Sequence, residues 1–227
     1  MADRITREAS LSARRVMLVG GGRWGRVHAG VLTQILPQGS EVLWVSRHNR
    51  EAAASFAAGK TGQTSIAMVA DIEQALKRKP DAAIIVTAAH THAAMARAAL
   101  ENGVPALVEK PFVLTRQDAD DLIALARAKS ILLGVGLHLL FASYLRHFRS
   151  LWRERIVVGA QIAWLDCETE ARYGETKRAD PSTPKVHDVY PHLWAVMHVL
   201  WPGQTPSVRD VESLPGGGAR LHLVDLA

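Results

Sequence analysis

Residues 16–25 have the sequence VMLVGGGRWG, in which four apolar residues run directly into glycines. A short apolar run of this kind is typical of a strand buried on both faces of a parallel sheet. The glycines at Gly20, Gly22 and Gly25 fit the pattern G-x-G-x-x-G. In a strand-turn-helix unit, the first allows a tight turn, the second lets the backbone approach a pyrophosphate, and the third lets helix and strand pack closely. The segment therefore predicts a dinucleotide-binding turn, with a plain strand-to-helix turn as the alternative.

Apolar runs alternate with helical stretches from residue 13 to residue 140. The expected strands cover residues 16–19, 41–46, 65–69, 81–87, 106–108 and 131–135. The expected helices cover residues 23–36, 51–58, 71–79, 91–102 and 115–129. Strands that alternate with helices form a parallel sheet with helices on both faces. We therefore predict an α/β protein in which residues 13–140 form a doubly wound Rossmann domain.

The alternation ends near residue 140, and residues 141–227 predict a smaller α+β domain. The expected elements are a helix over 142–155, a strand over 157–167, a polar loop over 172–186, a helix over 189–200 and a hairpin of strands over 206–214 and 220–226. The hairpin is indicated by the glycines and proline that separate its two strands. Because the last strand ends almost at the chain end, we expect this domain to be incomplete, with an open antiparallel sheet.

The composition excludes several classes of protein. Hydrophobic residues make up 48% of the 227 residues, which favours a packed core over disorder. The formal net charge is +5, but the basic residues are interleaved with acids, so we expect no nucleic-acid partner. The most apolar run, residues 131–145, is shorter than the ~20 residues of a membrane helix, so we expect no membrane contact. A single cysteine and a start without an apolar leader predict a cytoplasmic protein.

The residues after the second expected strand indicate which dinucleotide is preferred. An NAD site usually has an acidic residue at this place, which binds the ribose 2′-hydroxyl. This chain has Ser46 and Arg47 there, and residues 46–50 contain no acid. A hydroxyl followed by a guanidinium suits a 2′-phosphate, because arginine makes charge-assisted, forked hydrogen bonds. We expect NADP(H) to be preferred over NAD(H), unless Arg47 and Arg50 are ordinary surface charges.

Three motifs follow one another in a fixed order along the chain. The glycine pattern is followed by His28, residues 86–92 (VTAAHTH) precede an alanine-rich helix and the Glu-Lys-Pro tripeptide at 109–111, and residues 187–192 have the sequence HDVYPH. In order and spacing, these motifs resemble the Gfo/Idh/MocA family of NAD(P)-dependent oxidoreductases, named for glucose–fructose oxidoreductase and inositol dehydrogenase. The resemblance covers residues 15–201.

The resemblance implies roles for particular residues. Glu109 and Lys110 would lie beside the nicotinamide, with Lys110 contacting both cofactor and substrate hydroxyl, and Asp188 and His192 would complete the proton-handling group. The chemistry agrees, because alcohol oxidation needs a hydride acceptor, a base near pH 7 and stabilisation of negative charge on oxygen. The predicted cofactor-binding residues are Gly20, Gly22, Arg23, Trp24, Gly25, Ser46, Arg47, Thr87, His92, Glu109 and Lys110, and the predicted catalytic residues are Lys110, Asp188 and His192.

Each catalytic candidate also has a structural interpretation. Lys110 could be a loop lysine, Asp188 could cap a helix that begins at residue 189, and His192 could be a core histidine. We expect no metal site, because His187, His192 and His198 are spaced five and six residues apart and do not share one helix face.

Some positions differ from the family's usual pattern. Residues 87–89 are Thr-Ala-Ala where the family often has Thr-Pro-Asn, Tyr190 stands in place of glycine, and Ala195 in place of aspartate. We expect these differences to affect the class of substrate more than the binding of the cofactor. Family members often assemble through a longer C-terminal sheet, so the resemblance also implies a homo-oligomer formed through that sheet.

The sequence as a whole predicts an NADP(H)-dependent oxidoreductase. It would transfer a hydride between nicotinamide and a small molecule, namely a sugar, polyol or related hydroxyl, carbonyl or imine compound. The alternatives are a non-catalytic NAD(P)-binding regulatory or partner protein of the same fold, and a fragment that needs a missing tail for activity.

Overall fold

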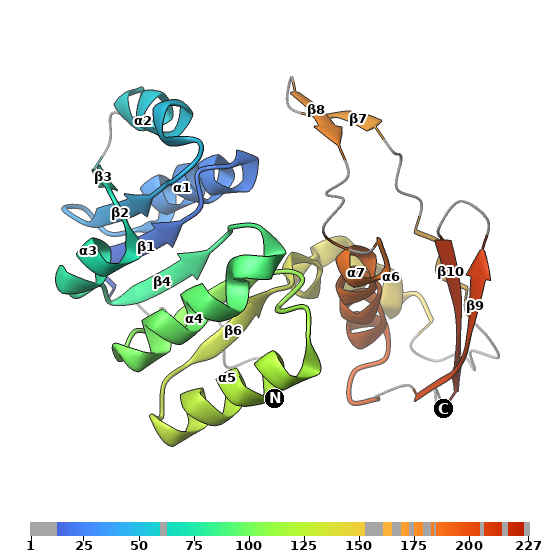
Figure 1. The fold of residues 1–227 in the computed structure, drawn as a ribbon. Helices are drawn as coiled ribbons and strands as arrows, with labels where there is room; N and C mark the ends of the chain where they lie inside the picture. Colours follow the sequence, from blue (N-terminus) through green and yellow to red (C-terminus); the bar gives the residue numbers. More distant parts are fainter. Residues whose placement is uncertain are drawn as a thin grey trace. The chain divides into compact units, whose positions relative to one another are not determined.

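The computed structural model describes residues 13–59, 63–152, 161–164, 169–172, 175–178, 183, 185–204, 207–214 and 218–224. The chain divides into two compact units, Met1–Gly136 and Leu137–Ala227 (Figure 1). We refer to them as the N-terminal and the C-terminal unit.

The N-terminal unit contains one sheet of parallel strands. Its strands are β1 (Arg15–Val19), β2 (Glu41–Val45), β3 (Ser65–Val69), β4 (Ala82–Ile85), β5 (Ala106–Glu109) and β6 (Leu133–Gly136). They lie in the order β3-β2-β1-β4-β5-β6, and every neighbouring pair is parallel. The predicted Rossmann sheet is thereby confirmed. The order reverses direction between β1 and β4, and ligands of such sheets bind outside the carboxyl ends of the strands at this reversal.

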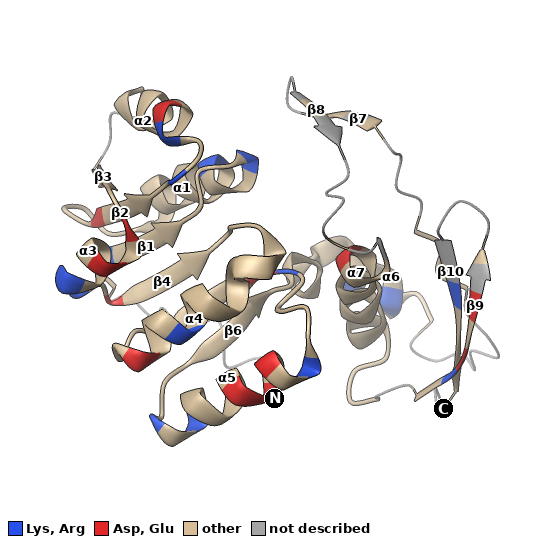
Figure 2. Cartoon of the chain, viewed as in Figure 1, with Lys and Arg blue, Asp and Glu red and all other residues tan. Residues whose placement is uncertain are grey.

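Helices connect the strands of this sheet. They are α1 (Arg23–Ile35), α2 (Arg50–Ala58), α3 (Ile72–Lys77), the short 3₁₀ helix η2 (Ala89–Thr91), α4 (His92–Glu101) and α5 (Arg116–Ala128). Asp71 caps α3, because its carboxylate accepts the Gln74 N–H at 2.8 Å. The acidic residues of α5 gather in its first half, whereas basic residues lie at its two ends (Figure 2), and Arg116 pairs with Asp120 at 3.4 Å.

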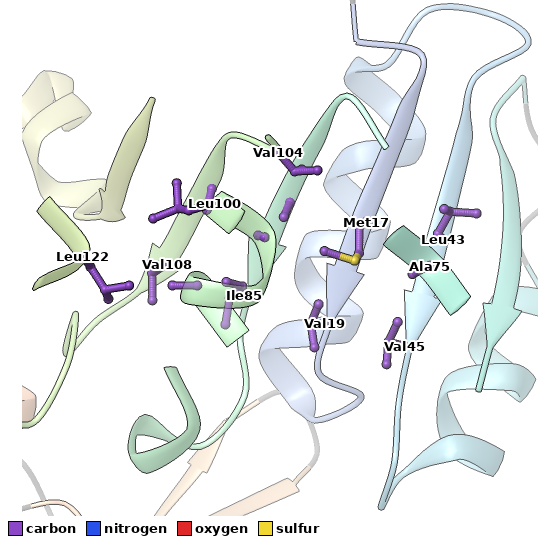
Figure 3. Packing of buried hydrophobic residues seen from close by; sticks show 14 of the residues in the cluster. Met17, Val19, Leu43, Val45, Ala75, Ile85, Leu100, Val104, Val108 and Leu122 are labelled. Atoms are coloured by element: carbon purple, nitrogen blue, oxygen red, sulfur yellow. The ribbon is translucent and has the colours of Figure 1, made fainter. Parts of the chain in front are cut away.

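Alternate residues of each strand pack against opposite layers of helices. Met17 and Leu43 belong to a core cluster that includes Ile85 and residues of α3, α4 and α5 (Figure 3). Leu18 and Trp44, one residue further along β1 and β2, belong to a second cluster with residues of α1 and α2. The continuous apolar runs in the sequence arise because both faces of the central strands are covered.

The C-terminal unit contains helices and two short antiparallel ribbons. Its elements are the 3₁₀ helix η3 (His138–Phe141), α6 (Ser143–Ser150), β7 (Thr169–Arg172), β8 (Glu175–Arg178), α7 (Lys185–Leu200), β9 (Ser207–Leu214) and β10 (Gly218–Val224). β7 pairs with β8, and β9 pairs with β10, both antiparallel. The last pair confirms the predicted C-terminal hairpin. Among the residues that the structure describes, every helix is too short or too polar to cross a lipid bilayer.

Three predictions for this unit are wrong. The polar loop expected over 172–186 contains β8, and α7 begins at Lys185, earlier than the expected residue 189. A ribbon held by backbone hydrogen bonds needs no alternation of apolar side chains, so its polar sequence gave no strand signal. Residues 161–164 of the strand expected over 157–167 are not in a strand, and the rest of that strand lies outside the described residues.

We predict that the Ile85→Ala variant is destabilised by about 2–5 kcal/mol, because it leaves a cavity between β4 and its helices. Ile85 has no exposed surface, whereas Leu132 is 81% exposed and provides a matched control. The Leu132→Ala change should alter the free energy of unfolding by no more than about 0.5 kcal/mol. Urea unfolding followed by circular dichroism measures both. Equal losses for the two variants would contradict the assigned core.

Candidate functional site

The first glycine of the loop occupies a place that no other residue fits. Gly20 has a φ of 124°, in the region that favours glycine, and a Cβ there would lie 2.6 Å from the Val86 carbonyl oxygen. Its N–H donates to the Val45 carbonyl at 2.8 Å, and its own carbonyl accepts the Trp44 indole N–H at 2.8 Å. Two hydrogen bonds therefore fix the turn to β2, and Val86, just after β4, leaves no room for a side chain at Gly20.

The other two glycines of the pattern differ in their surroundings. A Cβ on Gly25 would collide with the Gly20 carbonyl oxygen, so this glycine allows α1 to approach β1 closely. A Cβ on Gly22 would meet nothing within 4 Å. Gly22 is also the N-cap of α1, where no side chain caps the helix and the first turn holds no acid. The open space and the positive end of the helix dipole fit the pyrophosphate of a dinucleotide.

The residues after β2 take up different positions. Ser46 is buried beneath the loop, where a Cβ on Gly21 would collide with its hydroxyl oxygen. This hydroxyl makes no hydrogen bond within the described part of the chain. Arg47 is exposed, and Arg50 begins α2 and donates from Nη1 to the Val69 carbonyl at 3.2 Å. Of Ser46 and Arg47, the two residues predicted to bind the cofactor here, only Arg47 presents its side chain to solvent.

His92 bridges the segments that follow β4 and β5. Its ring is fully buried, with Nδ1 2.8 Å from the Pro111 carbonyl oxygen and Nε2 3.0 Å from the Thr87 carbonyl oxygen. The hydroxyl of Thr87 lies 2.6 Å from that of Thr91. The structure thus places His92 inside the protein, where it holds the two segments together.

Glu109 ends β5 as a partly buried carboxylate with two partners. Its Oε1 lies 3.0 Å from Nε2 of His28, and its Oε2 accepts the backbone N–H of Lys110 at 3.1 Å. Burial acts to raise the pKa of the Glu109 carboxyl, but the hydrogen bond and charge of His28 and the N–H and charge of Lys110 outweigh it. The pKa of Glu109 therefore lies below its ordinary value, and the group is ionised at neutral pH.

Asp188 and His192 lie four residues apart on α7 and so share one helix face. Asp188 is in the first turn and is not the cap, because the helix begins at Lys185. The ring of the buried His192 stacks on Trp164 with centroids 4.8 Å apart and an interplanar angle of 4°. His138 meets the same ring edge-on at 5.3 Å. His192 is thus held in an aromatic cluster of the C-terminal unit.

The structure brings together most of the predicted cofactor-binding residues at the carboxyl edge of the parallel sheet. These are the three glycines, Arg23 and Trp24 of α1, Ser46 and Arg47 after β2, Thr87 after β4, and Glu109 and Lys110 at the end of β5. Asp188 and His192 belong to the C-terminal unit. Within the described ranges, no group of three or more His, Cys, Asp or Glu residues could hold a metal ion.

The sequence interpretation gave no role to His28, the partner of Glu109. The signal that could have found it is its position one turn after Gly25 on the same helix, which brings it to the sheet edge where Glu109 ends β5. It also gave no role to Trp164, whose stacking on His192 has no signature in the sequence.

We predict that Gly22→Ala weakens cofactor binding without altering the fold. Gly22 has an ordinary φ of −70° and free space around it, so the melting temperature should change little. The added methyl group occupies the space left for the pyrophosphate, so the Kd for NAD(P)H should rise by about tenfold or more.

Gly25→Ala is the comparison, since its collision with the Gly20 carbonyl should lower stability and affinity together. Cofactor titration and thermal unfolding measure the two effects. Wild-type affinity in the Gly22 variant would show that no phosphate approaches the loop there.

Comparison with known proteins assigns the N-terminal unit to a family. The model of the Gfo/Idh/MocA oxidoreductase family, NAD-binding Rossmann fold, matches residues 14–137. The UDP-N-acetylglucosamine 3-dehydrogenase of Acidithiobacillus ferrooxidans is 35% identical over 122 residues, which are 54% of this chain and 36% of that protein.

Solved structures share the fold over most of the chain. A structure of UDP-N-acetylglucosamine 3-dehydrogenase GnnA from the same organism matches with a TM-score of 0.64 and 24% identity, covering 92% of this chain and 65% of that one. GenD2 from gentamicin A biosynthesis, in complex with NAD, matches with a TM-score of 0.65 and 21% identity, covering 96% and 62%. The chain therefore spans about a third of its curated relative and less than two thirds of these structures. It belongs to the Gfo/Idh/MocA family of oxidoreductases, and residues 14–137 are its NAD-binding Rossmann domain.

Proposed function

We propose that this protein is an NADP(H)-dependent oxidoreductase that transfers a hydride between nicotinamide and a sugar, polyol or related hydroxyl, carbonyl or imine compound. The observation that carries the proposal is the open space around Gly22. Gly22 lies at the start of α1, which no side chain caps, and at the same edge of the sheet as the end of β5, which leads into Lys110. The 35% identity to a UDP-N-acetylglucosamine 3-dehydrogenase supports a sugar or sugar nucleotide as the substrate class.

The preference for NADP(H) rests on the residues after β2. The exposed Arg47 follows the strand that in NAD sites ends in an acid, and a guanidinium favours the 2′-phosphate of NADP(H). Ser46 supports this less directly, because its hydroxyl is buried beneath Gly21. NAD(H) is the alternative cofactor.

The proposed chemistry divides between a hydride and a proton. A bound nicotinamide would supply or accept the hydride. The Lys110 ammonium would donate a hydrogen bond to the substrate oxygen and stabilise negative charge that develops on it. His192 would accept the hydroxyl proton, and Asp188, on the same face of α7, would stabilise the imidazolium that results.

A non-catalytic NAD(P)-binding regulatory or partner protein is the second candidate. The burial of His192 favours this candidate, because its ring is stacked face to face on Trp164. Such a protein would bind the cofactor and turn over no substrate.

We also propose that the protein forms a homo-oligomer through its C-terminal sheet. Val208 and Val211 of β9 are exposed, and exposed apolar residues on a two-stranded ribbon favour association with another sheet.

We predict that Lys110→Met lowers kcat by about 10²–10³-fold, because it removes the donor to the substrate oxygen. The Kd for NADPH should stay within about threefold, since the phosphates bind elsewhere. Lys129→Met is the control, because Lys129 donates to the Glu101 carbonyl at 2.8 Å at the far end of α5. Turnover of UDP-sugars, inositols and ketoses with both cofactors measures the effect. Cofactor binding without turnover on the whole panel would favour the regulatory protein.

Arg47→Ala should raise the Kd for NADPH by about tenfold or more and leave that for NADH within about twofold, because a charged hydrogen bond to the 2′-phosphate is lost. Arg116→Ala is the control, since the Arg116 side chain lies on the exposed face of α5. Energy transfer from tryptophan to the bound nicotinamide reports both affinities, with Trp24 exposed beside the loop. A parallel loss for both cofactors would contradict the assignment of Arg47 to the 2′-phosphate.

A further inference from the structure

His28 joins the helix of the glycine loop to the end of β5. It lies on α1, and its Nε2 is 3.0 Å from Oε1 of Glu109, a residue 81 positions later in the chain. The two side chains are 20% and 18% exposed, so water screens the pair only partly. An ionised carboxylate is only an acceptor, so Nε2 of His28 carries the proton. The contact is therefore a charge-assisted hydrogen bond between two separate elements, because the accepting carboxylate is ionised.

The end of β6 is shaped to accommodate this carboxylate. Gly136 pairs with Glu109 in the parallel register, and a Cβ on Gly136 would lie 3.0 Å from Oε1 and 3.1 Å from Cδ of Glu109. Any larger residue would press on the oxygen that His28 holds. The Glu109 carboxylate at the end of β5 thus lies close to both His28 of α1 and Gly136 of β6.

The second oxygen of Glu109 fixes the backbone that leads to the lysine. Oε2 accepts the N–H of Lys110 at 3.1 Å, so each carboxylate oxygen has a partner of its own. The ring of Trp24, on the same helix, lies 6.4 Å from the imidazole of His28. The charged groups facing the carboxylate are His28 and Lys110 themselves. A displacement of His28 would therefore release the carboxylate and with it the peptide of Lys110.

We propose that His28 is a positioning residue for Lys110, acting through the Glu109 carboxylate and coupling the dinucleotide loop to the lysine. This inference rests on the proposed function for the catalytic meaning of Lys110, but the coupling itself does not require turnover. A purely structural pair would stabilise the unit without altering the environment of the lysine.

The test compares His28→Gln with His28→Asn. The glutamine amide reaches the place of Nε2 and keeps a donor for Glu109, whereas the shorter asparagine amide does not. His28→Ala removes the donor altogether, and Gln34→Ala, at an exposed position of α1, is the matched control. All variants are first compared with the wild type by thermal unfolding.

The first readout does not depend on activity. Reductive methylation with formaldehyde, followed by peptide mass spectrometry, gives the reaction rate of Lys110 relative to that of Lys129 in the same protein. The ratio should change by about threefold or more in the asparagine and alanine variants, because a charged hydrogen bond is lost. It should stay near the wild-type value in the glutamine variant and in the control. Equal ratios in the asparagine and glutamine variants would overturn the proposal.

The second readout is turnover. With NADPH, kcat should fall by about tenfold in the asparagine variant and recover in the glutamine variant, while the Kd for NADPH stays within about twofold. Altered methylation of Lys110 in a protein that turns over no substrate would leave the coupling intact and refute the proposed function. Unaltered methylation together with normal turnover would refute the coupling alone.

Discussion

The close approach of α1 to β1 is the constraint on which the rest of the N-terminal unit depends. Gly25 packs against the Gly20 carbonyl with no room for a Cβ, and the same carbonyl accepts the Trp44 indole N–H. This arrangement fixes the start of α1 at the reversal point of the sheet, so the N-terminus of the helix opens onto the carboxyl edge. The place of the proposed phosphate site is therefore a consequence of how tightly helix and strand pack.

The remaining site residues are held by contacts between segments that follow different strands. His92 joins the end of β4 to the Lys110–Pro111 segment through two carbonyl oxygens, and His28 joins α1 to Glu109. His92 uses both ring nitrogens and His28 uses Nε2 in these contacts within the protein. Trp24 and Arg47 near this edge are exposed, and they are the groups that we propose contact the cofactor. Rigid inner contacts and free outer side chains are what a site needs to position a cofactor.

The sequence predicted the parallel sheet, the tight turn at Gly20 and the close packing at Gly25, because apolar runs and the glycine spacing report local geometry. It did not predict that Ser46 lies beneath Gly21, since burial of a short polar residue depends on the neighbouring loop. The pairing of His28 with Glu109 links residues far apart in the chain, which no periodicity reveals. The β7–β8 ribbon was missed because its residues are polar, and the catalytic roles of Lys110, Asp188 and His192 stay predictions.

Equilibrium binding of NADPH and NADH to the unaltered protein shows whether the glycine loop holds a dinucleotide and which one it prefers. Energy transfer from tryptophan to nicotinamide reports both titrations under the same conditions. We expect saturable binding of both cofactors, with NADPH bound about tenfold more tightly or better, because the exposed Arg47 would pair with the 2′-phosphate. Absence of binding by either cofactor would contradict the dinucleotide site, and tighter binding of NADH would contradict the assigned preference.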